Sequence, residues 1–302
     1  MNFFKNTFKI LAEKFSVVWA TLLYFFVAAV IIVSIVLSVF LPYIKLLTPE
    51  DFGVVNAAVE VLKQLSNGNF SAFADSFRDL WREVASGLGS RAWATSFLLF
   101  GVLAVSRFIF GFADYATYDI IHEHMSSAAK LGFMSRFIRS LGSAALFQIC
   151  KMAISLPFDI GVIVIMYFVS MLANIPALFL LTPFLVMLTA VMLFPLRLTL
   201  LGSLAPAMLE HKKNAPAAFV VSLGKLKGNF WRNYVSFISF FLAAIVFNVF
   251  FGLFTLTVGL LLTVPITFLF LKILCCVLFK HNSGLRYYVN KDTVVNNSII
   301  DK

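Results

Sequence analysis

Five ionisable residues lie inside or at the ends of long apolar stretches, and their type and position suggest chemistry. They are Arg107, Lys151, Asp159, Arg197 and Lys272. Charged side chains at membrane depth are costly, so they usually face a partner charge or a water-filled cavity. Because four of the five are basic, they predict a basic recess between helices that is suited to an anionic lipid headgroup or a small anion. The alternative is that the basic side chains reach the headgroups along the helix surface.

Asp159 discriminates between these interpretations, because a carboxylate side chain is too short to reach the headgroups. We expect Asp159 either to lie beside Arg107, Arg197 or Lys151, or to line water. Lys151 is eight positions away, which is about 12 Å along a straight helix. A direct pair between Lys151 and Asp159 would therefore need a bend at Pro157.

Other chemistry finds no support in the sequence. The phosphate-binding pattern G-x-x-x-x-G-K-[S/T] and the G-x-S-x-G serine elbow do not occur. His122 and His124 are two positions apart, so on a helix they would point to different sides, and we expect them in a solvated loop. Cys150, Cys275 and Cys276 lie in or beside apolar stretches and are predicted to be buried. We therefore predict no catalytic residue, no metal site and no cofactor.

The composition points to a membrane protein. The 302 residues are 61% hydrophobic and 13% charged, with a mean hydropathy of +0.95. Soluble domains average about 25% charged and about 45–50% apolar residues. A soluble protein of this size could not bury so much apolar surface. These values exclude the soluble globular, disordered, collagen-like and disulfide-scaffold classes, and we predict an all-α polytopic membrane protein.

A helix needs about 20 apolar residues to cross the hydrocarbon layer of roughly 30 Å. The apolar stretches 141–201 and 234–279 are too long for one crossing, so each is predicted to form a hairpin, turning near 173–176 and near 252–259. A bundle of six transmembrane helices follows. The predicted spans are about 17–41, 92–112, 148–172, 176–201, 234–254 and 257–279.

Three segments flank this membrane domain, 17–279. Residues 1–16 are basic and amphipathic, and they predict a helix lying on the headgroups before the first span. The loop 42–91 contains Thr-Pro-Glu-Asp at 48–51, a helix start, and two apolar stripes that predict amphipathic helices. Residues 280–302 are predicted to be a polar tail.

The loops alternate in charge. Segment 42–91 holds five basic and six acidic residues, whereas the opposite side of the predicted bundle holds fifteen basic and seven acidic residues. Cytoplasmic loops are enriched in Lys and Arg, so both termini are predicted in the cytoplasm of a bacterial cell with the protein in its inner membrane. On that side Lys225, Lys227, Trp231 and Arg232 are predicted to anchor the chain at headgroup level.

One stretch resembles a known family. Residues 197–210, with sequence RLTLLGSLAPAMLE, are followed by Ala217, Ser222 and the segment KGNFWR at 227–232. The pattern covers mainly residues 190–280. It is similar to the YciC-like membrane proteins and to the membrane domain found beside some glycerophosphoryl diester phosphodiesterases. The resemblance implies a six-helix bacterial inner-membrane protein. The phosphodiesterase activity is not carried over, because it belongs to a soluble barrel, and the long loop 42–91 departs from the pattern.

These observations predict a non-enzymatic membrane protein that interacts with the bilayer's anionic lipids, or with a membrane-protein partner, through its basic cytoplasmic surface. The partner could be a second copy of this chain; nucleic acid is not expected. The main alternative is a transporter or permease subunit for a small anionic solute, with Arg107, Asp159 and Arg197 in the path. An intramembrane enzyme ranks third, because no nucleophile and base form a visible pair.

Overall fold

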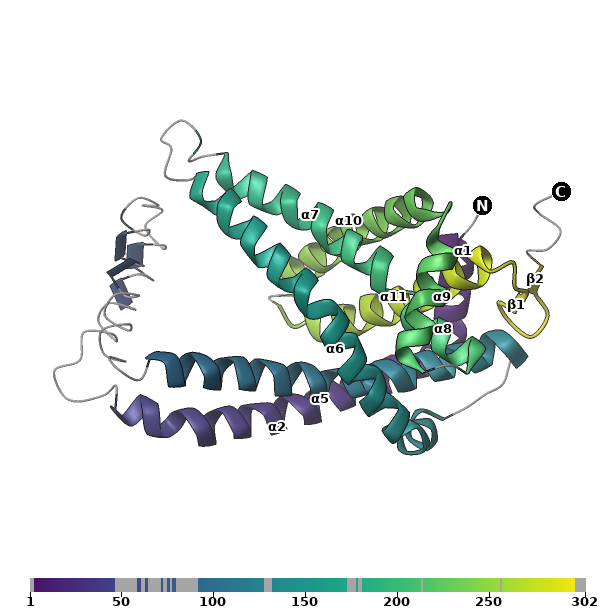
Figure 1. The fold of residues 1–302 in the computed structure, drawn as a ribbon, viewed down its shortest axis with the longest axis horizontal. Coiled ribbons are helices and arrows are strands. Elements are labelled where there is room, and N and C mark those ends of the chain that lie inside the picture. Colours follow the sequence, from purple (N-terminus) through teal and green to yellow (C-terminus); the bar gives the residue numbers. More distant parts are fainter. Residues whose placement is uncertain are drawn as a thin grey trace. The chain divides into compact units, whose positions relative to one another are not determined.

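A computed structural model provides the structure of the protein (Figure 1). It describes residues 3–46, 59–60, 63–64, 72, 75–76, 78–79, 92–127, 132–172, 178, 181–212, 214–255 and 257–296. The chain forms two compact units: residues 1–25 together with 110–302 make the larger one, and residues 26–109 make the smaller one. Each unit is described by itself.

The described chain is almost entirely helical. Its long helices are α2 (Ser16–Leu46), α5 (Ala92–Ser127), α6 (Phe133–Met171), α7 (Thr182–Leu201), α10 (Phe230–Phe254) and α11 (Leu260–Asn282). Three shorter helices are α1 (Phe3–Glu13), α8 (Leu204–His211) and α9 (Ala215–Leu226). Among the described residues, six helical segments are long and apolar enough to cross a membrane. The prediction of an all-α polytopic membrane protein is therefore confirmed.

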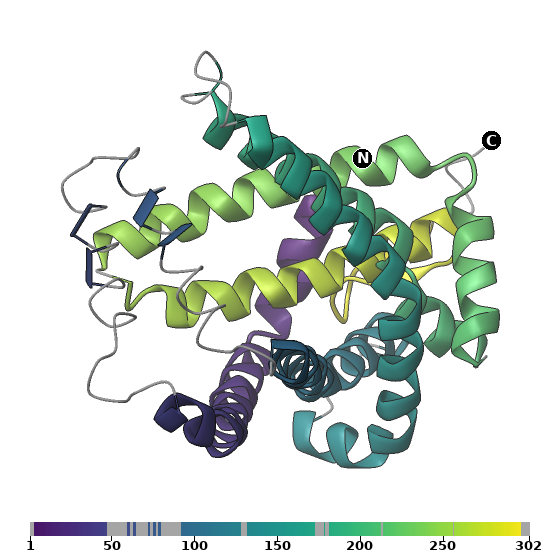
Figure 2. The ribbon, with the colours of Figure 1, turned by 60° about the vertical axis from the view of Figure 1, so that its left-hand side comes forward.

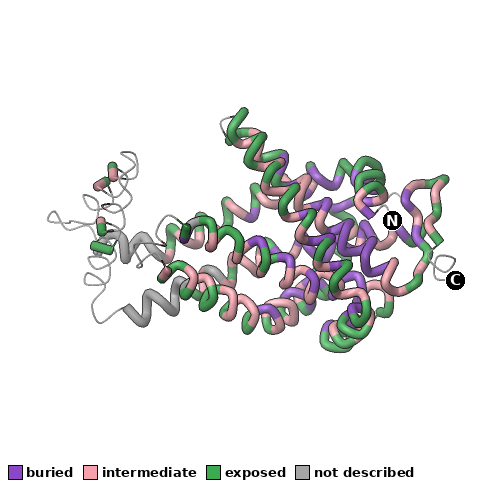
Figure 3. The backbone as a smooth tube through the Cα atoms, turned by 90° about the horizontal axis from the view of Figure 1, so that it is seen from above, coloured by how far each residue is buried: buried purple, intermediate pink, exposed green. Residues whose placement is uncertain are grey.

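Helix α11 lies at the centre of the larger unit. Every residue from Lys272 to Lys280 on it is buried. A helix that is buried on all sides needs neighbours on all sides, and α11 packs against α1, α8, α9 and α10. Figure 2 shows α10 and α11 side by side, and Figure 3 shows the buried positions gathered toward the chain termini. The half of α11 near its C-terminal end is therefore the core of this unit.

Helices α5 and α6 extend well beyond the predicted spans. α5 continues to Ser127, 15 residues past position 112, and α6 begins at Phe133, 15 residues before position 148. With 36 and 39 residues, they are about 54 and 58 Å long, which exceeds the hydrocarbon layer. The α5 extension stays helical although it is less apolar, because Ala116, Ile121 and Met125 are buried in the core.

Helix α1 follows the amphipathic prediction for residues 1–16. It buries Phe3, Thr7, Ile10 and Leu11 and leaves its lysines exposed. Figure 1 shows α1 crossing α11. At this crossing the ring of Phe3 lies 5.1 Å from that of His281, edge to face.

The C-terminal tail departs from the prediction of a polar segment starting at residue 280. α11 continues to Asn282, and Lys280 is only 4% exposed. Beyond it, strands β1 (Tyr287–Tyr288) and β2 (Val294–Val295) pair antiparallel. Asn6 donates a hydrogen bond to the hydroxyl of Tyr287 at 3.0 Å. Burial raises the pKa of Tyr287, and this hydrogen bond opposes the shift. The tail thus packs against α1 through a buried tyrosine.

In the smaller unit, the later part of α2 and the first part of α5 run side by side (Figures 1 and 2). Most of the loop 42–91, with its predicted helices, lies outside the described residues, as does the predicted turn at 173–176. The turn between α10 and α11, of which residues 255 and 257–259 are described, falls between Phe254 and Leu260, within the predicted range.

Candidate functional site

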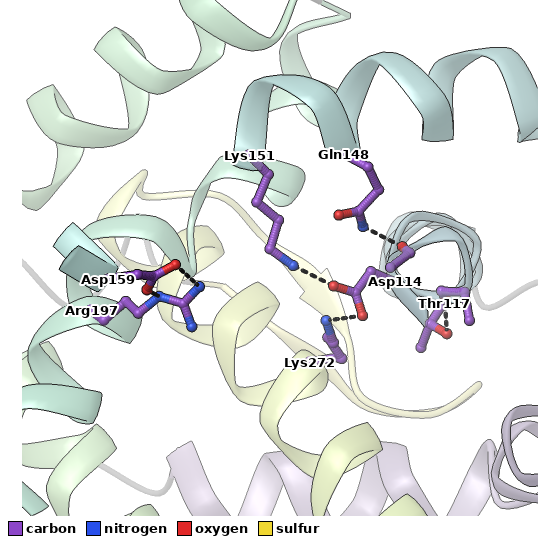
Figure 4. A network of polar contacts seen from close by, with 9 residues as sticks. Asp114, Thr117, Gln148, Lys151, Asp159, Arg197 and Lys272 are labelled. Carbon is purple, nitrogen blue, oxygen red and sulfur yellow. Dashed lines mark hydrogen bonds and ion pairs between the residues drawn. The ribbon is translucent and has the colours of Figure 1, made fainter. Parts of the chain in front are cut away.

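A buried carboxylate joins three helices of the larger unit. Asp114 on α5 lies between Lys151 on α6 and Lys272 on α11 (Figure 4). The Lys272 ammonium lies 2.7 Å from Oδ1 of Asp114, and the Lys151 ammonium donates to Oδ2. Asp114 is 6% exposed and Lys272 is 5% exposed. We call these three residues the Asp114 cluster. Each carboxylate oxygen has its own ammonium partner, so the charge of Asp114 is compensated, while the two ammonium groups leave the cluster with a net positive charge.

Aromatic rings and a close helix approach surround this cluster. The Lys272 ammonium lies 4.4 Å from the ring centre of Phe268 and 4.7 Å from that of Tyr118, within range of a cation–π interaction. Beside it, the side-chain amide of Gln148 donates to the carbonyl of Gly111. A Cβ on Gly111 would clash with that amide carbon. Glycine therefore lets α6 place Gln148 against the α5 backbone.

Ion pairs join the extensions of α5 and α6. Arg136 on α6 lies 3.3 Å from Asp119 on α5 and also pairs with Glu123. Further along α6, Lys151 meets Asp114, which comes earlier on α5. This reversed order is that of two antiparallel helices. The acids stand on α5 and the bases on α6, so each pairing holds the two helices in this register.

Asp159 pairs with Arg197, which joins α6 to α7. Nε of Arg197 lies 2.8 Å from Oδ1 of Asp159, and Nη2 donates to Oδ2 at 3.4 Å. This is one of the arrangements expected for Asp159 from the sequence, and it needs no pair with Lys151 across Pro157. In Figure 4 the Asp159–Arg197 pair and the Asp114 cluster form two separate groups.

A third group links α5, α8 and α11. Glu210 pairs with the Lys280 ammonium, and Nε2 of His122 lies 2.9 Å from Oε2 of the same carboxylate. The expectation that His122 and His124 occupy a solvated loop is wrong. Both lie on the α5 extension, and His124 is 1% exposed.

The five residues of the predicted recess thus have different environments. Lys151, Asp159, Arg197 and Lys272 lie in the larger unit and each has an oppositely charged partner there. Arg107 is half-buried on the part of α5 that belongs to the unit 26–109. A recess that binds an anion stays a prediction.

Asp114 was not predicted as a buried charge, because the apolar stretch that precedes it ends at Phe112. A signal was present, since Tyr118, Ile121 and Met125 follow Asp114 at helical spacing. All three are buried beside it on α5. Extending the helix along this stripe would have placed Asp114 on a buried face.

A basic and aromatic surface lies where α9 meets α10. We call it the rim; it consists of Lys225, Lys227, Trp231 and Arg232. Gly228, with φ of 83°, allows the chain to turn there. Trp231 is 73% exposed, and its ring lies 5.4 Å from Phe230 and 5.9 Å from Tyr234.

The rim arginine is held by neutral groups. Nη2 of Arg232 donates to the side-chain oxygens of Asn229 at 2.6 Å and Asn282 at 2.7 Å. Its guanidinium also lies 5.9 Å from the ring of Phe3 on α1. Amide oxygens position a guanidinium without cancelling its charge, so Arg232 keeps a full positive charge at the surface.

Within the described residues, no group of three or more His, Cys, Asp or Glu side chains is placed to hold a metal ion. Cys275 and Cys276 are buried free thiols on α11. Comparison of the chain with protein-family models, with curated proteins and with solved structures gave no match.

Proposed function

We propose that the protein is a non-enzymatic protein of the bacterial cytoplasmic membrane that binds anionic phospholipid headgroups through the rim. The observation that carries the proposal is the exposed Trp231 between Lys227 and Arg232 at the start of α10. Trp and Tyr side chains favour the membrane–water interface, and Lys and Arg beside them attract anionic headgroups.

The contrast with the bases that pair with carboxylates supports this assignment. Lys151, Arg197, Lys272 and Lys280 each have a carboxylate partner, which lowers their attraction for an external anion. The described contacts of Arg232 are to amide oxygens and an aromatic ring. A lipid phosphate would therefore gain more from the rim than from the bundle interior.

The proposal includes an orientation with both termini in the cytoplasm. Its support is the charge of the loops, with fifteen basic and seven acidic residues on the side of the termini against five and six in segment 42–91. A reporter that is active only outside the cytoplasm should be active when it is fused within 42–91. An inactive reporter at this position would overturn the orientation.

The headgroup assignment is tested by native mass spectrometry of protein released from nanodiscs with equal phosphatidylglycerol and phosphatidylcholine. We expect the wild type to retain phosphatidylglycerol preferentially. The triple variant Lys225→Gln/Lys227→Gln/Arg232→Gln should lose most of this preference. The matched control Arg286→Gln/Lys291→Gln removes exposed charges from the tail and should keep it. Equal retention of the two lipids by the wild type would contradict the proposal.

A transporter for a small anionic solute is the second candidate, favoured by one observation. The Asp114 cluster holds two ammonium groups and one carboxylate, and the Lys151 side chain is 26% exposed. In proteoliposomes, anion flux that falls in Lys151→Gln and Asp159→Asn would favour this candidate. The resemblance of residues 190–280 to YciC-like proteins stays a prediction, and neither proposal depends on it.

A further inference from the structure

An apolar cavity lies between α1 and the hairpin formed by α10 and α11, beside the contacts that join α1 to α11. It measures about 210 Å³ and is bordered by Phe4 and Phe8 on α1, by Phe240 on α10 and by Phe270 on α11. The ring of Phe270 stacks on Phe240 at 5.5 Å and meets Phe8 edge to face at 4.8 Å. All three rings belong to the lining of the cavity. For comparison, an apolar cavity of about 150 Å³ is large enough for a benzene molecule.

An open, shallow hollow on the surface of α10 adjoins the cavity. This second hollow, of about 470 Å³, is lined by Leu242, Val246 and Phe250, and it shares Ala243 and Phe247 with the first. From Phe240 to Phe250 the helix rises about 15 Å. We call the two hollows together the α10 groove.

The lining of the α10 groove offers no polar group to a ligand. Its one hydroxyl, on Thr267, donates to the carbonyls of its own helix at Thr263 and Val264, 3.0 and 2.9 Å away. The remaining lining side chains are aliphatic or aromatic. An apolar groove on a membrane-spanning helix suits a hydrocarbon chain.

Two lysines of α1 lie at one edge of the α10 groove. Around the axis of α1, the buried residues come first, then Phe4 and Phe8, which line the groove, and then Lys5 and Lys9. Both lysines are exposed, and Phe8 is 61% exposed between the core and the lysines. An interfacial helix with this order places its lysines at headgroup level and its phenylalanines against acyl chains.

We propose that the α10 groove holds one acyl chain of an anionic phospholipid whose phosphate lies near Lys5 and Lys9. The choice of an anionic lipid rests on the proposed function, whereas the acyl-chain site rests on the apolar lining alone. The lipid would couple α1 to the α10–α11 hairpin, since its chain fills the space between them.

The first test fills the groove. Ala243 lines both hollows, so Ala243→Trp should displace the chain; the control Val249→Trp places the same ring on an exposed position of α10 outside the lining. After delipidation with detergent, native mass spectrometry should show one retained phospholipid on the wild type and on Val249→Trp, and at least a tenfold lower occupancy on Ala243→Trp. Equal occupancy in all three would overturn the proposal.

A second measurement does not depend on the folding of a variant. The wild type is reconstituted with phosphatidylglycerol that carries a photoreactive diazirine near the end of one acyl chain. Illumination should label the α10 peptide at groove-lining positions such as Val246 and Phe250 at least fivefold more than at Val249. Uniform labelling of the helix would indicate ordinary annular lipid and overturn the site.

Variants that test the headgroup contact distinguish this inference from the function proposed for the rim. Lys5→Gln/Lys9→Gln should lower the preference of the retained lipid for phosphatidylglycerol over phosphatidylcholine by several-fold, and an unchanged preference would overturn the anionic assignment. Loss of the retained lipid in Ala243→Trp together with no effect of the Lys225→Gln/Lys227→Gln/Arg232→Gln variant would support the groove and contradict the rim.

Discussion

The Asp114 cluster and the rim use the same residue types for opposite purposes. In the cluster, one buried carboxylate holds two lysines, of which Lys272 is buried and Lys151 is 26% exposed. In the rim, Lys227, Trp231 and Arg232 are exposed. A buried charge that loses its partner is strongly destabilising, whereas an exposed charge contributes little to folding. The difference teaches that the interior bases hold helices together, while the exposed bases remain available to a ligand.

The largest effect is expected for Asp114→Asn, which leaves two ammonium groups without their shared counter-charge. We expect the free energy of unfolding to fall by about 3–5 kcal/mol. Equilibrium unfolding in mixed micelles measures it, with Asp292→Asn in the exposed tail as the control. A loss below about 1 kcal/mol would show that the cluster does not support the fold.

The second largest loss of stability is expected for Glu210→Gln. It removes the carboxylate that pairs with buried Lys280 and contacts His122, but Glu210 is itself partly exposed. We expect a loss of about 1.5–3 kcal/mol, the range for hydrogen bonds to charged groups. The same unfolding assay applies. If Glu210→Gln matched the wild type, the Lys280 contact would not contribute to stability.

Lys272→Met sharpens the comparison, because Asp114 keeps Lys151 as a partner. Replacing a buried charge by an apolar side chain of similar length removes its desolvation cost, so we expect less than about 1.5 kcal/mol of destabilisation. The ranking of Lys272→Met below Asp114→Asn is the informative result. The reverse ranking would mean that Lys272, and not the carboxylate, organises the cluster.

Tyr287 gives a pH-dependent effect in the tail. Burial raises its pKa, so the folded protein holds the phenolic proton more tightly than the unfolded chain. Its contribution to stability is complete below the unfolded value of about 10 and is lost as the pH rises through the raised value. Tyr287→Phe should cost about 1 kcal/mol at pH 7, through the lost hydrogen bond with Asn6, and should lose stability less steeply than the wild type above pH 10. Parallel pH profiles would contradict this account.

The rim should give the smallest effect on stability. Lys227→Gln/Arg232→Gln should change the free energy of unfolding by less than about 0.5 kcal/mol, since exposed substitutions rarely do more. Its effect should appear in lipid retention instead. A destabilisation comparable to that of Asp114→Asn would erase the distinction between the two regions.

Much of the architecture was predictable from hydropathy, because six apolar stretches of sufficient length require membrane-spanning helices. The pairing of Asp159 was narrowed to three bases for a similar reason, since a buried carboxylate needs a nearby cation. The structure supplied the choice of Arg197, which depends on how α6 packs against α7.

The extensions of α5 and α6 were not predictable from apolar length alone. Their helices continue beyond the apolar stretches because ion pairs and a few buried side chains hold them together, as at Arg136 with Asp119. The same limit of hydropathy explains why three members of the ion pairs were not predicted: Asp114, Glu210 and Lys280. Each lies near the end of an apolar stretch, where hydropathy assigns a charge to a loop.

One head-to-head measurement tests the central claim that anionic lipid is bound by the exposed bases and not by the paired ones. Phosphatidylglycerol retention from mixed nanodiscs is compared between Lys227→Gln/Arg232→Gln and Lys151→Gln. The account predicts a several-fold loss in the rim variant and near wild-type retention in Lys151→Gln. Loss in Lys151→Gln with full retention in the rim variant would contradict it and return the binding site to the bundle interior.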